Sequence, residues 1–303
     1  MKNLAVLFLS LSINLSLYAQ WQQTNGVFGG RTYCFKETFG GIYVGTYNGA
    51  YYSNDTARNW MRKSNGISSG KAIFSMVNNG GNLLIGTNDG IYASTNAGAT
   101  WSDVSLGLTN TFIRSILIDS AFVFAASQDG VFKSADGGNS WTSSSLGFSS
   151  MDITYLAKQG STIFAGTFDG GLYKTSDSGA IWSNVDSSFT GTMVSSIAVI
   201  AGDIFVSTLD SGVYRSSNGG QTWLQQNNGL PSNYITGLAI AGGNIMAIHS
   251  NSNIYVSGNG GQNWSLLGVI GSNVQIYAIE EVFGLLWAGT DVGVYISSDG
   301  GLN

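Results

Sequence analysis

The stretch Ser134-Ala135-Asp136-Gly137-Gly138-Asn139-Ser140-Trp141 decides the fold, because its pattern returns through the chain at a nearly constant interval. The shared skeleton is Ser/Thr-x-Asp/Asn-x-Gly-x-x-Trp. A period this regular indicates one supersecondary unit copied in tandem, and about 40 residues per unit suits one blade of a β-propeller. Successive copies are 41, 40, 41, 41, 41 and 40 residues apart, with their acidic or amide positions at Asp55, Asn96, Asp136, Asp177, Asn218, Asn259 and Asp299.

The residue types of this octapeptide predict a turn between two strands. Asp and Asn side chains accept hydrogen bonds from the backbone two residues further on, and Gly adopts the positive φ that such a turn needs. The Trp then begins the next strand with a large apolar ring that can anchor the turn on a neighbouring sheet. We therefore expect Asp136 to be hydrogen-bonded within its own turn and Trp141 to be buried. Six copies end in tryptophan, at Trp60, Trp101, Trp141, Trp182, Trp223 and Trp264.

With these motifs the sequence resembles the Asp-box, or BNR-repeat, β-propellers of the sialidase-like superfamily, which include secreted bacterial proteins. The resemblance covers residues 20–303 and implies an all-β, seven-bladed β-propeller of four-stranded antiparallel blades. It also places the octapeptide between the third and fourth strands of each blade, away from any active site. In the third repeat, short runs rich in Val, Ile and Phe predict strands at 113–119, 122–127, 130–134 and 141–145.

The two ends of the repeat region match each other. The segment from Trp21 to Gly26 has the form of the strand that follows the octapeptide elsewhere, as from Trp223 to Gly229. The chain stops at Asn303, one residue before the seventh Trp is due. Trp21 can therefore supply the missing outer strand of the last blade and close the ring, which removes an unpaired sheet edge. The alternative is a fragment whose next residue is Trp.

Residues 1–19 have the composition of a Sec-type signal peptide, with Lys2, an apolar run, and Ala19 before the cleavage site expected ahead of Gln20. This predicts an exported protein, secreted or in the periplasm or at the cell surface, with no membrane insertion. The rest of the chain has 11 basic and 17 acidic residues, so nucleic acid is a poor partner. Cys34 is the sole cysteine, which rules out an internal disulfide, and with one histidine, His249, no metal or cofactor is expected.

In a propeller, the hairpins between the second and third strands lie on the same face as the links between blades, and the resemblance implies that sites are found there. Aromatic rings pack against sugar faces, and carboxylates accept hydrogen bonds from hydroxyls. Asp-Gly pairs also suit two-residue type I′ hairpins, so a structural reading of the aspartates stands beside the functional one. The candidate ligand-binding residues are Arg31, Tyr33, Tyr47, Asp89, Arg114, Asp129, Phe168, Asp169, Asp210, Tyr234 and Asp291.

The sialidase site itself is not recognisable. Sialidases of this superfamily hold the substrate carboxylate with three arginines and use a tyrosine nucleophile, a glutamate partner and an aspartate acid/base. Of the five arginines here, only Arg31 and Arg114 fall on inter-blade links, and the single proline, Pro231, leaves no Arg-Ile-Pro signature. An acidic face would also repel an anionic sugar, so we expect no sialidase activity and better tolerance of neutral sugars.

We therefore expect a monomeric, non-catalytic propeller that binds a glycan or a protein partner on this face, and the sequence assigns no catalytic residue. One alternative is a glycoside hydrolase that acts on a neutral polysaccharide with two aspartates, since sequence does not give the separation of two carboxyls. Another is a scaffold or assembly factor, because fold does not choose among functions. His249 stands where other repeats have Thr and is interpreted as a drifted repeat position, not as a general base.

Overall fold

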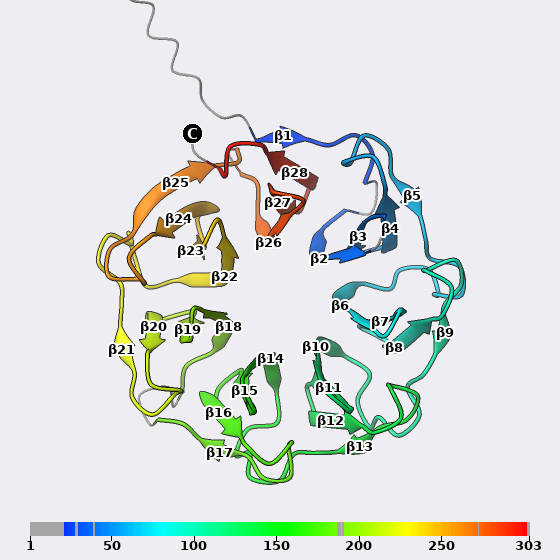
Figure 1. Ribbon diagram of the computed structural model, residues 1–303, viewed down its shortest axis with the longest axis horizontal. Helices are drawn as coiled ribbons and strands as arrows, with labels where there is room; N and C mark the ends of the chain where they lie inside the picture. Colours follow the sequence, from blue (N-terminus) through cyan, green and yellow to red (C-terminus); the bar gives the residue numbers. More distant parts are fainter. Residues whose placement is uncertain are drawn as a thin grey trace, which may run out of the picture.

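The computed structural model of the chain describes residues 21–27, 30–38, 40–186, 189, 191–271 and 273–301. These residues form seven four-stranded antiparallel sheets, arranged as blades around a central channel (Figure 1). The protein is thus a seven-bladed β-propeller, and the fold predicted from the repeats is confirmed. In this part of the chain no helix is long and apolar enough to span a membrane. The signal peptide predicted at residues 1–19 lies outside the described residues.

Each of the first six blades contains four strands in chain order from the channel outwards. Blade 1 comprises β2 (Thr32–Thr38), β3 (Gly41–Thr46), β4 (Gly49–Ser53) and β5 (Met61–Arg62). Blade 2 comprises β6 (Ile73–Asn79), β7 (Asn82–Thr87), β8 (Gly90–Ser94) and β9 (Ser102–Asp103). Blade 3 comprises β10 (Ile113–Asp119), β11 (Phe122–Ser127), β12 (Gly130–Ser134) and β13 (Thr142–Ser143).

The second half of the ring repeats this order. Blade 4 comprises β14 (Ile153–Gln159), β15 (Thr162–Thr167), β16 (Leu172–Thr175) and β17 (Ser183–Asn184). Blade 5 comprises β18 (Val194–Ile200), β19 (Asp203–Thr208), β20 (Gly212–Ser216) and β21 (Leu224–Gln225). Blade 6 comprises β22 (Ile235–Ala241), β23 (Asn244–His249), β24 (Asn253–Ser257) and β25 (Ser265–Val269). Blade 7 comprises β26 (Ile276–Val282), β27 (Leu285–Thr290) and β28 (Gly293–Ser297), and its outer strand is β1 (Gln22–Gln23).

The ring is closed by the first described residues. Gln22 lies opposite Ile296 and Gln23 lies opposite Tyr295, so β1 supplies the fourth strand of blade 7. Trp21 is 8% exposed and packs with the buried side chains between blades 6 and 7, Leu267 and Leu286 among them. The closure expected from the matching ends is therefore present.

The core lies between neighbouring blades, because each sheet packs its two faces against the sheets on either side. Between blades 2 and 3, for example, Leu84 and Ile91 pack with Ile113, Phe132 and Trp141. A strand that is covered on both faces needs apolar residues in succession instead of alternation. This explains why the second strand of each blade reads as a nearly continuous buried run, as in β3, where all six residues are buried.

The octapeptide turn lies between the third and fourth strands, at the predicted place. In blade 3, Asp136 Oδ1 accepts hydrogen bonds from the backbone nitrogens of Asn139 and Ser140, both at 3.0 Å. Gly138 has a φ of 99°, and a Cβ there would lie 2.8 Å from a Leu84 methyl carbon, so both backbone and packing require glycine. Trp141 is 3% exposed. The expected turn bonds and tryptophan burial are confirmed for this copy.

The hairpins between the second and third strands differ from the expected type I′ turn. That turn needs positive φ at both central residues. In blade 2, Thr87 pairs with Gly90, and positive φ (106°) occurs at Gly90 and not at Asp89. The Thr87 hydroxyl accepts a hydrogen bond from Asp89 N (2.9 Å) and donates one to Gly90 O (3.0 Å), so this hydroxyl closes the turn. The type I′ expectation was wrong because the threonine supplies the turn's hydrogen bonds.

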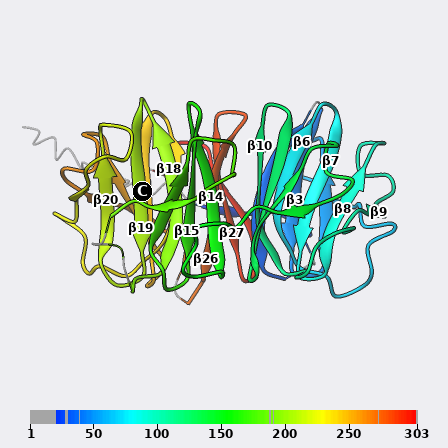
Figure 2. The same ribbon diagram turned by 90° about the horizontal axis from the view of Figure 1, so that it is seen from below.

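The loops gather at two opposite faces of the disc, which Figure 2 shows from the side. We call the face with the hairpins between the second and third strands and the links between blades the hairpin face. The other, the turn face, carries the octapeptide turns and the hairpins between the first and second strands. The candidate ligand-binding residues belong to loops and strand ends of the hairpin face.

Candidate functional site

The inner strand of every blade has a β-bulge near the hairpin face. In β10, Ile113 lies opposite Ser127 and Ser115 lies opposite Ala126, so Arg114 is the extra residue. A bulge leaves its extra residue out of the ladder and re-aims the side chain. The same shift occurs in all seven inner strands, and the bulged residues are Tyr33, Phe74, Arg114, Thr154, Ser195, Thr236 and Tyr277.

Aromatic residues occupy the bulges of blades 7, 1 and 2. The ring centroid of Tyr33 lies 5.3 Å from that of Tyr277 and 5.1 Å from that of Phe74. Phe74 in turn lies 5.0 Å from Phe112, in the link that leads to blade 3. We call these four residues the aromatic arc. Ring contacts of this kind contribute roughly 0.5–1.5 kcal/mol per pair beyond area burial, so the arc forms one preorganised surface across the blades.

An arginine lies at each end of the aromatic arc, and the two differ in their partners. The Arg114 guanidinium is 5.3 Å from the Phe112 ring centroid and forms an ion pair with Asp152. The Arg31 guanidinium is 5.7 Å from the Tyr277 ring centroid, is exposed, and has no ion pair among the described residues. The Tyr33 and Tyr277 side chains, together with the charge of Asp291, raise the pKa of Arg31.

The bulged residues on the opposite side of the ring are small and already engaged. Thr154 Oγ1 donates to Val194 O (2.6 Å) and Ser195 Oγ donates to Ile235 O (2.7 Å), each in the next blade. These bonds join blades 4, 5 and 6. The channel opening is consequently asymmetric, with aromatic rings and guanidiniums on one side and small hydroxyl side chains on the other.

Below the aromatic arc, the channel has a volume of about 510 Å³ and polar groups in its wall. Burial raises the pKa of Glu280, and the charge of Lys36 opposes that shift. Burial also raises the pKa of the Cys34 thiol to about 12. Because the thiolate is the reactive form of cysteine, this shift disfavours Cys34 as a nucleophile at neutral pH. No cluster of His, Cys, Asp or Glu side chains in the described ranges is arranged to hold a metal ion.

Four of the five hairpin aspartates bond their hairpin to the link that enters the same blade. Asp89 forms an ion pair with Lys71 (2.8 Å), and Asp291 Oδ1 accepts a hydrogen bond from Gln275 N (2.9 Å). Asp129 and Asp169 accept hydrogen bonds from the hydroxyls of Thr109 and Ser150, which also lie in the links that enter their blades, while Asp210 bonds with its neighbour Ser211 (3.0 Å). Their carboxylates belong to five different blades, and each has a local partner.

The structure brings together only part of the candidate set. Arg31, Tyr33 and Arg114 belong to the aromatic arc or its ends. Exposed aromatic rings also occur at Tyr47, Phe168 and Tyr234, but these lie in blade 1, in blade 4 and in the link to blade 6. Sequence reasoning missed Phe74 and Tyr277. Both directly follow the first apolar residue of an inner strand, and aligning that position across the repeats would have found them.

The remaining arginines do not complete a carboxylate-binding triad. Arg215 in β20 is paired with Asp203 at 2.6 Å. Arg58 lies in the first octapeptide turn and Arg62 in β5, the outer strand of blade 1. These positions are far along the blade from the bulged residues of the inner strand, so Arg31 and Arg114 are the two arginines beside the arc.

His249 has a hydrogen-bonding pattern that excludes a general base for Ser232. Its Nδ1 accepts a hydrogen bond from Asn251 N (3.1 Å), and its Nε2 lies 2.7 Å from Ser232 Oγ. Since Nδ1 is an acceptor, the proton of the neutral ring is on Nε2 and is directed at the serine oxygen. His249 thus replaces the Thr hydroxyl that accepts a backbone N–H in the equivalent turn of other blades.

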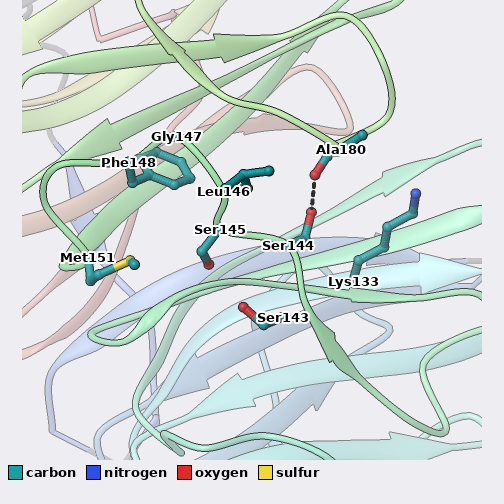
Figure 3. A pocket seen from close by; sticks show the side chains of 10 residues that line it. Lys133, Ser143, Ser144, Ser145, Leu146, Gly147, Phe148, Met151 and Ala180 are labelled. Atoms are coloured by element: carbon teal, nitrogen blue, oxygen red, sulfur yellow. Dashed lines mark hydrogen bonds between the residues drawn. The ribbon is translucent and has the colours of Figure 1, made fainter.

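A larger depression of about 640 Å³ lies between blades 3 and 4 (Figure 3). Its polar groups join the two blades: Ser144 Oγ donates to Gly179 O (2.6 Å), and Lys133 Nζ donates to Ser178 O (2.7 Å). Lys133 Nζ also lies 3.6 Å from the ring centroid of Phe122. Because Ser144 and Lys133 bond blade 3 to blade 4, the polar groups of the depression have a structural role. The depression is therefore a weaker candidate for a binding site than the channel opening.

Comparison with known proteins supports the same architecture. A family profile described as "DUF6242 beta propeller domain" matches residues 11–154. The extracellular domain of the putative one component system BT4673 from B. thetaiotaomicron is similar, with a TM-score of 0.79 and 18% identity, over 92% of this chain and 40% of that one. The extracellular domain of the putative hybrid two component system BT3049 from the same organism gives 0.71 and 14%, over 90% and 40%.

A propeller of similar size also resembles this chain. YCF48 bound to D1 peptide has a TM-score of 0.71 and 14% identity, with coverage of 92% of this chain and 95% of that one. No curated protein matches the sequence. At such identities the likeness concerns the fold, and the chain spans about 40% of the length of the two B. thetaiotaomicron domains. The chain is thus similar to propeller domains of bacterial sensor proteins and to a peptide-bound propeller.

Proposed function

We propose that the protein is a non-catalytic binding module whose partner docks on the aromatic arc at the hairpin face. The observation that carries this proposal is the arc itself. Four aromatic side chains, from blades 7, 1 and 2 and from the link to blade 3, are joined by ring contacts of 5.0–5.3 Å. At one end lies the Arg31 guanidinium, which has no ion pair among the described residues. Binding sites are usually concave, and three of the four rings, Tyr33, Phe74 and Tyr277, line the opening of the channel. Four of the five hairpin aspartates, which a hydrolase would need free, are engaged with the links, and Asp210 bonds with its neighbour Ser211.

A protein partner fits this surface better than a glycan. The middle of the arc is formed by Phe74 and Phe112, whose rings have no hydrogen-bonding atom. The peptide bound to the similar propeller YCF48 supports the same choice. A glycan is the second candidate, favoured by the exposed rings of Tyr47, Phe168 and Tyr234 on the hairpin face.

The proposal also covers the cellular location and the oligomeric state of the protein. Residues 1–19 direct export, the octapeptides act as Asp-box turns, and the protein works as a monomer outside the cytoplasm. The extracellular position of the similar B. thetaiotaomicron domains supports this setting.

The test is retention of ligands by immobilised protein, with a peptide library and a set of neutral polysaccharides, xyloglucan included, applied separately. We expect peptides to be retained by the wild-type protein and lost from Phe74→Ala and Tyr277→Ala. Tyr47→Ala removes an exposed aromatic ring from the same face and serves as the control that keeps binding. Retention of polysaccharide alone would favour the glycan candidate, and binding unaffected by Phe74→Ala would refute the aromatic arc as the site.

A further inference from the structure

We propose that Arg31 binds a carboxylate of a peptide segment in the partner, supplied by a free C-terminus or by an Asp or Glu side group. The proposal rests on the proposed binding function of the aromatic arc and names the chemistry that the arc selects.

The cations around the channel opening differ in whether they form ion pairs. Lys71 is neutralised by Asp89 and Arg114 by Asp152, so neither cation is available without breaking an ion pair. Arg31 is exposed and forms no ion pair in the described part of the protein, although the carboxylate of Asp291 is near enough to raise its pKa. An incoming carboxylate therefore finds one free guanidinium, at the Tyr277 end of the arc.

Arg31 is held in place before a ligand arrives. Its guanidinium lies over the Tyr277 ring, 5.7 Å from the ring centroid, and the Tyr277 ring is itself packed against Tyr33. A planar guanidinium fixed in this way can donate two parallel hydrogen bonds to a carboxylate, a geometry that lysine cannot provide. Preorganisation lowers the entropy lost when the pair forms.

The aromatic arc beside Arg31 favours a ligand with an apolar side chain next to its carboxylate. An exposed ion pair by itself contributes little affinity, so the ligand needs a second contact. Beside Arg31 that contact is the aromatic arc, which continues from Tyr277 and Tyr33 to Phe74 and Phe112. An apolar side chain next to a carboxylate satisfies both parts of the surface, and peptides commonly combine the two.

A carboxylated sugar fits less well, because the groups that would receive its hydroxyls are already occupied. Thr154 and Ser195 donate their hydroxyl hydrogens to backbone carbonyls in the next blade. Asp129 and Asp169 accept from Thr109 and Ser150. A sugar ring on Phe74 and Phe112 would leave its hydroxyls without partners there, and unpaired polar groups are unfavourable.

The experiment uses matched peptides with the purified protein. A library of fluorescein-labelled pentapeptides with apolar residues at the last two positions is made twice, once with a free C-terminal carboxylate and once with a C-terminal amide. A third set has the amide end and an internal Asp, with Asn twins. We expect the best free-acid or Asp peptide to bind about three- to fivefold more tightly than its neutral twin, the upper part of the range for an exposed ion pair with good geometry.

Three variants distinguish the role of Arg31 from the binding function proposed for the aromatic arc. Arg31→Gln should abolish the preference for the carboxylate and leave the weak binding of the neutral twin, whereas Arg58→Gln, an equal loss of charge in an octapeptide turn, should change neither. Phe74→Ala should weaken both twins together. Loss of binding in Phe74→Ala with an unchanged preference in Arg31→Gln would overturn the role of Arg31 and leave the arc intact.

Two further outcomes would also overturn the proposal. Absence of binding by every acidic peptide would remove the peptide carboxylate as the ligand. Binding of an oligogalacturonate that depends on Arg31, without binding of the acidic peptides, would assign the carboxylate to a glycan. The proposal is supported if the protein prefers the acid twin and Arg31→Gln removes that preference. Comparison of the C-terminal and internal-Asp sets then shows which source of carboxylate binds more tightly.

Discussion

Trp141 Nε1 donates a hydrogen bond of 2.9 Å to the carbonyl oxygen of Val104, in the link that leaves the preceding blade. Equivalent bonds join Trp101 to Lys63 O (2.8 Å) and Trp182 to Ser144 O (2.7 Å). Each of these tryptophans therefore both fills the core between two blades and ties its octapeptide turn to the link before it. This explains how a turn on one blade stabilises the position of its neighbour.

Replacing Trp141 with Ala should lower the free energy of unfolding by about 3–5 kcal/mol, through loss of burial and the cavity left between blades 2 and 3. Chemical denaturation followed by circular dichroism measures the change. Thr142→Ala, at the exposed next position of β13, is the control and should lie within about 0.5 kcal/mol of wild type. An equal effect of both substitutions would contradict the anchoring role of the indole.

Trp182 and Trp223 should respond differently to replacement by Phe. Trp182 Nε1 has a carbonyl partner, whereas Trp223 Nε1 is buried with no hydrogen-bond partner in the described structure. Trp182→Phe leaves the Ser144 carbonyl unpaired, and we expect a loss of about 1–3 kcal/mol beyond the effect of volume. Trp223→Phe removes an unsatisfied donor and should be less destabilising. Thermal unfolding of the two variants side by side would contradict this if Trp223→Phe were the more damaging.

The octapeptide turns should contribute to the loss of stability in acid. The Asn59 backbone N–H lowers the pKa of Asp55 to about 2, and the hydroxyls of Ser140 and Thr175 lower the pKa values of Asp136 and Asp177. An unfolded Asp titrates near pH 4. Because the folded pKa values are depressed, this stabilisation is present above about pH 4 and is lost as pH falls towards about 2.

The corresponding experiment replaces all three aspartates with Asn, the residue that already occupies this position at Asn96, Asn218 and Asn259. Asn96 Oδ1 accepts a hydrogen bond from Thr100 N at 2.9 Å, which shows that the amide can perform the turn's function. We expect a thermal midpoint near that of wild type at pH 7 and a shallower decline between pH 4 and pH 2. Parallel declines in the two proteins would show that other groups control the acid transition.

Deleting residues 21–25 should destabilise the whole ring. The deletion removes β1 from β28, exposes a sheet edge and empties the place of Trp21 between blades 6 and 7. We expect the thermal midpoint to fall by roughly 5–15 °C, given a loss of about 3–5 kcal/mol for a buried tryptophan in a domain of this size. Gln22→Ala, at an exposed position of β1, should leave the midpoint unchanged. A deletion variant as stable as wild type would refute closure by β1.

The purified protein should not hydrolyse a fluorogenic sialoside. Hydrolysis would need three guanidiniums on the sugar carboxylate, whereas Arg114 is paired with Asp152 and Arg215 with Asp203, which leaves Arg31 as the free one beside the arc. A single guanidinium can bind a carboxylate but does not supply a nucleophile. Turnover above the buffer blank that disappears in Arg31→Ala would contradict this, and turnover of xyloglucan would favour the hydrolase alternative.

Sequence repetition predicted most of the fold because its signals are local. The octapeptide closes its turn with side-chain bonds that span four residues, as between Asp136 and Ser140, and this geometry is encoded within each repeat. The match of Trp21 with the later tryptophans likewise predicted the partner of β28. The predicted strands at 113–119, 122–127 and 130–134 agree with β10, β11 and β12, and the fourth is shorter, as β13.

The site was decided by the tertiary structure. Tyr277 and Tyr33 come from the last and first repeats and contact each other only because the ring closes, which brings blade 7 beside blade 1, while Phe74 contacts Tyr33 from the next blade. The bulge in each inner strand then re-aims these side chains, and a period-2 reading of the strand does not reveal it. The sequence by itself determined the blade, its turns and the closing strand, because these depend on near neighbours along the polypeptide and on the repeat. Only the folded ring decided which charges are paired, since Asp152 reaches Arg114 across a blade boundary, while Arg31 forms no ion pair with any described residue.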